Sequence, residues 1–155
     1  MTPDLRDELK QRKPFVSLEQ EAQLSIVRTS MLLFDAFEQL LKPHGISSTQ
    51  YNVLRILRGA EPTGLCRNEL RDRMLTRMPD VTRLLDRMEQ ADLVTRERSS
   101  EDRRLVRTRI TKKGARLLRQ LDDVVEQEHQ RRLGHLSREQ LKSLISLLSV
   151  VRQKT

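Results

Sequence analysis

The chain has 155 residues, with 30 basic and 22 acidic side chains and a net charge of +8. This length suits one domain with a buried core. A single cysteine excludes an intrachain disulfide framework and a thiolate zinc site. No stretch is apolar enough to span a membrane, and the charged N-terminal residues differ from a secretory signal. We therefore expect a helix-rich cytoplasmic protein without a metal, a cofactor or a membrane partner.

The positive charge is concentrated in one third of the chain. Residues 66–116 carry 15 basic and nine acidic residues, a net charge of +6, whereas the rest of the chain has a net charge of +2. Such asymmetry favours a polyanionic partner, most simply nucleic acid. A solvated surface of mixed charges would have the same composition, so composition alone leaves both interpretations open.

The N-terminal third is predicted to be a mobile arm followed by one long helix. Residues 1–16 have no strong period and are expected to contain at most a short helix. Ser17 and Gln20 have the spacing of a capping box, which starts a helix. Apolar residues then recur at helical spacing until Pro43 and Gly45 end the pattern.

Three shorter helices are predicted next. A capping box of Ser47 and Gln50 opens the first, and the second covers residues 67–74. The third begins with Pro79, which has no N–H to lose in a first turn, and with Asp80, which complements the helix dipole. Two brief helices joined by few residues fit a helix-turn-helix, whose second helix can enter a major groove.

The periodicity then changes from helix to strand and back. Alternation over residues 94–98 and 106–110, on both sides of a polar hexapeptide, predicts a β-hairpin that must pack on helices. Thr111 is expected to cap a long helix that breaks near Gly134. Ser137 opens the last helix through a third capping box.

Two stretches of the chain resemble motifs of one family. Asp-Arg-Arg at 102–104, followed by Ile-Thr-Lys-Lys-Gly at 110–114, resembles the wing signature of the MarR family of bacterial transcriptional regulators. Residues 79–89 are similar to the recognition helix of that family. Residues 91–96 are similar to its lead into the wing, with Asp92 where many members have Gly.

The resemblance implies a mainly α-helical fold with a small β-hairpin wing, in one unit over residues 17–152. Residues 17–45 and 112–152 would be dimerisation helices, and residues 46–111 a winged helix-turn-helix. It also implies a homodimer that regulates transcription from a pseudo-palindromic site on double-stranded DNA, with half-sites about 10 base pairs apart. Apolar stripes that the small central lobe cannot cover agree with a second copy of the chain.

Six candidate DNA contacts lie at or near the recognition helix. Thr82 and Arg83 occupy its first turns, where an arginine can hold guanine O6 and N7 together. Asp80 either accepts from cytosine N4 or caps the helix, and the cap is the favoured role. The remaining three are Arg77 and Arg87, which suit phosphates or surface ion pairs, and Pro79, which touches a thymine methyl or only starts the helix.

Three further candidates lie at the tip of the wing. In the family, the arginine of the Asp-x-Arg signature enters the minor groove and the aspartate holds it, and these positions correspond to Arg104 and Asp102. A narrow minor groove attracts guanidinium groups through its enhanced negative potential. Arg103 would contact a phosphate. The alternative is a mobile loop tip whose charges face solvent.

Family members often bind small aromatic or phenolic anions, which release a repressor from its operator. Phe34, Phe37, His44, Tyr51 and Arg55 could line such a crevice, or they could be core and surface residues, so the ligand-binding residues stay unknown at this stage.

Two alternatives to an effector-controlled regulator remain. Cys66 stands at the predicted start of a helix, where a thiol can be activated and oxidised, or where it merely replaces Ser in a cap. The chain could instead be a helical protein-interaction module without operator specificity. We expect no enzymatic activity, because the sequence contains no phosphate-binding glycine loop and no motif around a nucleophile.

Overall fold

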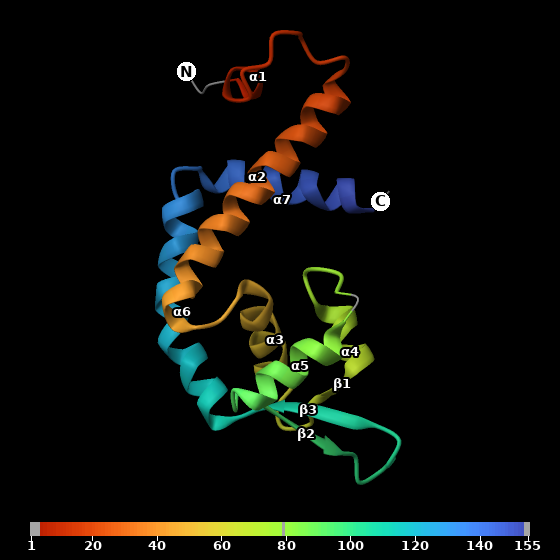
Figure 1. Ribbon diagram of the computed structural model, residues 1–155. Helices are drawn as coiled ribbons and strands as arrows, with labels where there is room; N and C mark the ends of the chain where they lie inside the picture. The colour runs from red at the N-terminus through yellow and green to blue at the C-terminus, as the bar shows by residue number, and fades with distance from the viewer. Residues whose placement is uncertain (1–3, 79, 154–155) are drawn as a thin grey trace.

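The computed structural model describes residues 4–78 and 80–153, and it places a small mixed lobe below a group of long helices (Figure 1). The chain runs through α1 (Leu5–Glu8), α2 (Leu18–Leu41), the 3₁₀ turn η1 (Lys42–His44), α3 (Ser48–Arg58), β1 (Leu65–Cys66), α4 (Arg67–Arg73), α5 (Val81–Gln90), β2 (Val94–Arg98), β3 (Val106–Ile110), α6 (Lys112–Leu133) and α7 (Arg138–Arg152). The predicted mainly α-helical fold with a wing is confirmed.

Most helices begin where the capping residues predicted. Ser47 with Gln50 forms a complete capping box at α3, and the box at Ser137 opens α7 in the same way. Thr111 caps α6 by accepting from the Gly114 N–H at 3.0 Å. Only the first box differs from prediction.

At the start of α2, Ser17 accepts from the Gln20 N–H, but the Gln20 side chain accepts from Val16 N–H instead of closing the box on Ser17. The helix therefore begins as predicted, although its cap reaches one residue further back along the chain.

The wing strands pair as predicted, and a third strand joins them. β2 and β3 are antiparallel, with Val94 opposite Ile110 and Arg98 opposite Val106. The two-residue strand β1 pairs with the other edge of β3, so the sheet order is β1-β3-β2. The prediction of a two-stranded ribbon missed β1, because two residues are too few to show an alternating pattern.

The core lies within the lobe and extends onto α6. Its buried apolar residues come from α3, α4, α5, the sheet and the lower part of α6, and they include Val53, Leu54, Leu57, Leu65, Leu70, Leu84, Leu85, Met88, Leu93, Val94, Leu118 and Leu121. Gly114 permits the close approach of α6 to this core, because a Cβ there would lie 2.5 Å from the Leu93 carbonyl oxygen. The Gly of the Lys-Lys-Gly motif is therefore required by packing.

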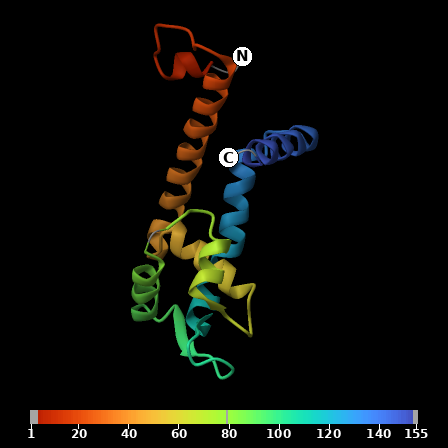
Figure 2. The same ribbon diagram turned by 90° about the vertical axis from the view of Figure 1, so that its right-hand side faces the viewer.

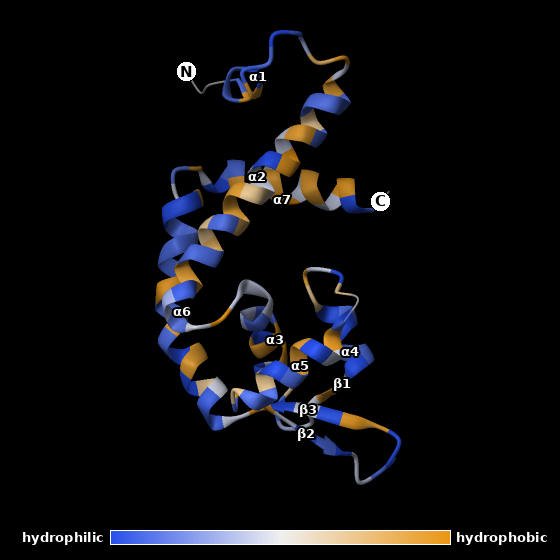
Figure 3. Ribbon diagram, viewed as in Figure 1, coloured by the Kyte–Doolittle hydropathy of each residue, from blue (hydrophilic) through white to orange (hydrophobic). Residues whose placement is uncertain are grey.

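The upper helices leave much of their apolar surface uncovered. In α2 only Leu41 is buried, and in α7 no residue is buried. Figure 3 shows apolar bands along both helices, and Figure 2 shows α7 projecting away from the lobe. Polar contacts also join α2 and α6 to α3: Glu38 accepts from the Ser48 N–H at 2.8 Å, and Arg58 pairs with Asp122 at 3.0 Å.

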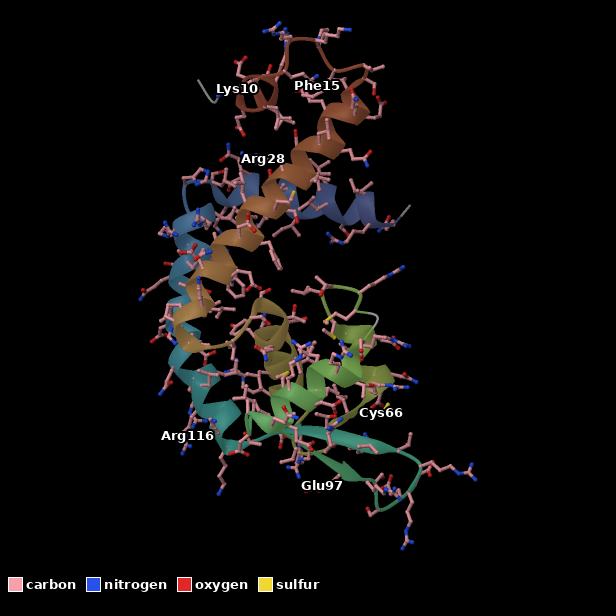
Figure 4. All side chains as sticks on the ribbon, viewed as in Figure 1. Lys10, Phe15, Arg28, Cys66, Glu97 and Arg116 are labelled. Atoms are coloured by element: carbon pink, nitrogen blue, oxygen red, sulfur yellow. The ribbon has the colours of Figure 1, made fainter. Side chains whose placement is uncertain are left out.

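Within the described residues, no helix is long and apolar enough to cross a membrane. The predicted arm contains the short helix α1, which lies above the N-terminal end of α2 together with Lys10 and Phe15 (Figure 4).

Candidate nucleic-acid interface

Helix α5 has one buried face and one exposed cationic face. Val81, Leu84, Leu85 and Met88 are buried in the lobe. The opposite side exposes Thr82, Arg83 and Arg87. This division follows from the 3.6-residue period of the helix, which places the apolar residues on one side. The three predicted contact residues of α5 are therefore accessible to a ligand as large as duplex DNA.

The start of α5 gives Asp80 the capping role. Its Oδ1 accepts from the Arg83 N–H at 2.9 Å, and its other carboxylate oxygen lies 3.7 Å from the Arg83 guanidinium. The helix begins at Val81, so Asp80 is the N-cap and not a residue of the first turn. Arg77 is exposed in the preceding loop. Pro79 lies outside the described residues.

The tip of the wing is an ordered turn. The Ser99 N–H donates to the Leu105 carbonyl at 2.8 Å, and the Leu105 N–H donates to the Asp102 carbonyl at 2.9 Å. The Asp102 Oδ1 accepts from the backbone N–H of Arg104 at 2.9 Å. Arg103 and Arg104 are exposed on this turn, and nitrogen-tipped side chains project from the wing in Figure 4.

In this structure the contact between Asp102 and Arg104 differs from the one that the resemblance implied, which stays a prediction for the DNA-bound protein. The resemblance implied that the carboxylate holds the guanidinium. In the structure it holds the backbone N–H of Arg104, and among the described residues Asp102 forms no ion pair with that side chain. The physical reason is the local turn, in which an aspartate oxygen reaches the N–H two residues ahead at little cost.

Three arginines at the base of the wing are used for structure. Arg96 pairs with Asp86 at 2.6 Å and with Glu89 at 2.8 Å, which joins β2 to α5. Hydrogen bonding to Glu89 and then to Asp86 raises the pKa of Arg96. The other two pairs are Arg109 with Glu61 at 2.8 Å and Arg107 with Glu69 at 3.7 Å.

Each of these ion pairs neutralises acidic side chains together with an arginine. The excess of positive charge in this part of the chain therefore remains. The basic residues of 66–116 that form no ion pair with another described residue are Arg67, Arg73, Arg77, Arg87, Arg98, Arg103, Arg104, Lys112, Lys113 and Arg116. Four of the predicted DNA contacts belong to this group: Arg77, Arg87, Arg103 and Arg104. Their charge is available to an anionic partner.

A cleft of about 410 Å³ separates α4 and α5 from the wing. Thr82 of α5 and Arg104 of the wing both line it, so the fold brings together two predicted residues that are 22 positions apart. The walls also include Arg67, whose guanidinium donates to the Thr82 hydroxyl at 3.2 Å. Among the residues that the structure describes, the other candidates do not line this cleft.

Arg67 is a candidate that sequence analysis missed. It is the first residue of α4, it is exposed, and its hydrogen bond to Thr82 places it beside the recognition helix. Its position at the start of the first helix of a helix-turn-helix could have signalled it. The distance to Thr82, however, depends on how the two helices pack.

Cys66 caps α4 at the edge of the same cleft and is half-buried. Its backbone N–H donates to Glu69 Oε2 at 2.8 Å, and this hydrogen bond lowers the pKa of Glu69. Figure 4 shows Cys66 on the α4 side of the lobe. Redox sensing through this thiol stays a prediction, which a Cys66→Ser variant treated with peroxide would test.

A second cavity of about 380 Å³ lies between α2, α3, α6 and the loop after α4. We call it the effector cavity after the small molecule that the resemblance led us to expect. Phe34, Phe37, Tyr51 and Arg55 line it, as the sequence analysis suggested. His44 does not, because η1 places it near the N-terminal part of α6 instead.

The effector cavity has an aromatic floor. Phe37 packs edge-on against Tyr51 at 5.3 Å and stacks on His129 at 6.3 Å, so rings from α2, α3 and α6 meet there. Burial raises the pKa of the Tyr51 phenol. Arg55 lines the same cavity and forms no ion pair with another described residue.

Glu128 is a buried carboxylate in the wall of the effector cavity. Its side chain is 9% exposed and accepts from Arg131 at 2.8 Å and Arg132 at 2.7 Å. Hydrogen bonds from Arg131 and then Arg132 lower the pKa of Glu128 to about 2. Its negative charge is therefore compensated.

Comparison with known proteins shows which family has this architecture. A model of the MarR family matches residues 46–106. The chain is 39% identical to a MarR transcription factor from Planctomyces limnophilus, whose crystal structure aligns over 88% of this chain and 99% of that one with a TM-score of 0.67.

Two further proteins are similar over most of their length. The HTH-type transcriptional regulator FarR of Neisseria gonorrhoeae is 27% identical over 126 residues, which are 81% of this chain and 85% of that protein. The transcriptional repressor CouR, solved bound to a 23-mer DNA duplex, is 27% identical, with 95% of this chain and 96% of that chain covered and a TM-score of 0.74.

A helix-turn-helix with an exposed cationic second helix, flanked by an arginine-tipped β-ribbon, defines a winged-helix DNA-binding protein. The chain belongs to the MarR family, and it is a DNA-binding transcriptional regulator of that family.

Proposed function

We propose that the protein is a homodimeric repressor, which binds a pseudo-palindromic operator and is released from it by a small aromatic or phenolic effector. The observation that carries the DNA-binding part is the shared cleft, where Arg67, Thr82 and Arg104 meet between the recognition helix and the wing. A relative, CouR, is a transcriptional repressor whose structure was solved on duplex DNA. The repressor role follows by analogy with that protein.

The exposed apolar faces support a dimer. Met31 is 60% exposed on α2, and Ile145 and Leu147 are 64% and 66% exposed on α7. Large contiguous apolar patches mark interaction surfaces, and a second copy of the same chain covers them by two-fold symmetry. We assign residues 17–45 and 112–152 to dimerisation and residues 46–111 to DNA binding.

Each candidate residue has a proposed role on DNA. Thr82 and Arg83 reach base edges in the major groove, while Arg104 enters the adjacent minor groove. The phosphate contacts are assigned to Arg77, Arg87, Arg103 and the added Arg67. Asp80 and Asp102 act through the backbone, by capping α5 and by ordering the wing turn.

The effector cavity suits an aromatic molecule with a negative or phenolic oxygen. Its apolar wall from Phe34 and Phe37 can bury a ring, and Arg55 can bind an anionic oxygen. Arg55→Ala should therefore weaken binding of an aromatic carboxylate such as benzoate more than that of neutral benzene, as measured by calorimetry. Equal losses for both molecules would contradict this role.

Selection of genomic fragments by the purified protein, followed by footprinting, tests the function. We expect a protected palindrome with half-sites about one helical turn apart. Neutralising about 6–10 phosphates should lower affinity about 10³–10⁵-fold between 50 and 200 mM salt. Equal affinity for palindromic and scrambled duplexes, together with a tight protein complex, would favour the interaction module instead.

A further inference from the structure

A single hydrogen bond joins the wall of the effector cavity to the loop that leads into the recognition helix. Asn52 lies on α3, lines the cavity, and accepts through Oδ1 from the backbone N–H of Leu75 at 3.0 Å. Leu75 belongs to residues 74–78, called here the turn loop, which follows α4. The N-cap of α5, Asp80, comes five residues after Leu75.

The turn loop forms part of the cavity wall itself. Leu75 and Thr76 line the effector cavity beside Asn52, so an occupant would touch the loop and its tether at once. The turn loop therefore connects the wall of the cavity to the start of α5.

The remaining anchors of the turn loop lie at its ends. Met74 and Met78 pack partly buried against the core, and the Met74 N–H donates to the Arg71 carbonyl at 3.2 Å. The Leu75 side chain is 85% exposed and contributes little burial. The hydrogen bond from the Leu75 N–H to Asn52 thus fixes the middle of the loop to the cavity wall.

We propose that Asn52 is a positioning residue that couples the contents of the effector cavity to the placement of α5. An occupant that displaces the Asn52 side chain, or presses on Leu75, breaks this hydrogen bond and frees the turn loop. Asp80 then shifts, and with it the base-contacting residues Thr82 and Arg83. The inference rests on the proposed function and names the residue through which an effector would release the protein from its operator.

The expected size of the effect follows from one hydrogen bond. Its net contribution corresponds to about a two- to twelvefold change in an equilibrium constant. Asn52→Leu removes the acceptor, so we expect operator Kd to rise about three- to tenfold. Asn52→Asp retains an acceptor oxygen and should restore Kd to within about twofold of the parent.

Amide hydrogen exchange supplies a readout that needs no DNA. In the Asn52→Leu protein, the Leu75 amide should exchange about tenfold faster than in the parent, while amides in the buried part of α3 keep their rates. Unchanged protection of Leu75 would overturn the inference. This measurement uses the free protein, so it tests the inference about Asn52 without relying on DNA binding. The proposed function is tested separately, by an operator-binding assay of the parent protein.

A filled cavity can be imitated without knowing the effector. Thr49 lines the cavity on the same helix as Asn52, so Thr49→Trp places a large side chain inside it, and Thr49→Val is the reference at the same position. With Asn52 present, we expect the Trp variant to bind operator about fivefold more weakly than the Val variant. In the Asn52→Leu background, this ratio should fall below about twofold, because the connection is already broken.

Equal ratios in both backgrounds, or no effect of Thr49→Trp on operator Kd, would overturn the proposal. A residue with a merely structural role would lower the thermal midpoint and act additively with the Trp substitution. Thermal unfolding of all variants, and their mass in solution, identify any protein that fails to fold or assemble.

Discussion

Asp102 holds the backbone of Arg104, with Oδ1 2.9 Å from the Arg104 nitrogen, and this hydrogen bond shapes the tip of the wing. The turn fixes the direction in which the Arg104 side chain leaves the ribbon. A guanidinium that must enter a narrow groove benefits from a fixed starting point, because less conformational entropy is lost when it binds. We therefore propose that Asp102 supports DNA binding by fixing the geometry of this turn.

This relationship predicts different effects for two Asp102 variants. Asp102→Asn keeps an oxygen that can accept the Arg104 N–H, so operator affinity relative to scrambled DNA should stay within about twofold of the parent. Asp102→Ala removes the acceptor and should lower that ratio about three- to tenfold. Fluorescence anisotropy measures both. If Asp102→Asn is as weak as Asp102→Ala, the carboxylate charge acts on the guanidinium after all.

Arg104→Ala should weaken operator binding by about tenfold or more without changing the mass of the proposed dimer. The reason is loss of the cation that we place in the minor groove. Arg116→Ala is the matched control: it removes the same charge from the start of α6, on the opposite side of the molecule from the wing tip (Figure 4). Equal losses for both variants would indicate a general charge effect.

Substitution of Arg83 and substitution of Arg103 should lower DNA affinity in different ways, which depend on the base sequence of the duplex. Arg83→Ala is expected to lose about 1–3 kcal/mol at one base pair and little elsewhere, since we assign Arg83 to a base edge. Arg103→Ala should weaken all duplexes similarly and reduce the salt slope by about 1. An operator series with single base-pair changes, titrated at several salt concentrations, separates the two. If Arg83→Ala instead lowers the affinity for all duplexes equally, Arg83 contacts a phosphate and not a base edge.

Ile145→Asp should dissociate the dimer at micromolar concentration, because it buries a charge in the apolar face that we assign to the second copy. Ile145 is 64% exposed in the single chain, so the folded lobe itself should tolerate the change. Ser146→Asp adds the same charge to the polar side of α7 and should leave the mass unchanged. Light scattering gives the result, and an unaltered dimer for Ile145→Asp would place the interface elsewhere.

Glu128 should make part of the stability depend on pH. Its pKa is lowered from 4.5 to about 2 in the folded protein, so the folded state favours the ionised form. The stabilisation is present above pH of about 4.5 and is lost as the pH falls toward 2. Glu128→Gln should remove this contribution and flatten the decline of the thermal midpoint across that interval. Glu126→Gln, on the exposed side of α6, is the control and should keep the parent's decline.

Cap residues and periodicity predicted most elements because both act locally. Ser47, Thr111 and Ser137 satisfy helix N–H groups within three residues, so their effect is visible in a short window of sequence. The alternation of the wing strands is equally local. The strand β1 escaped prediction because its partner, β3, lies more than 40 residues away.

The same distinction between local and long-range interactions applies to the candidate site. The residue types, their positions on the recognition helix and wing, and the concentration of positive charge were all present in the chain itself. The roles of Arg67 and Asn52 depend on contacts with Thr82 and Leu75, residues 15 and 23 positions away. Such pairs arise only when helices pack, because hydrophobic burial sets the packing and is indifferent to which polar groups it brings together. The same packing decided which arginines are neutralised at the base of the wing and which remain free.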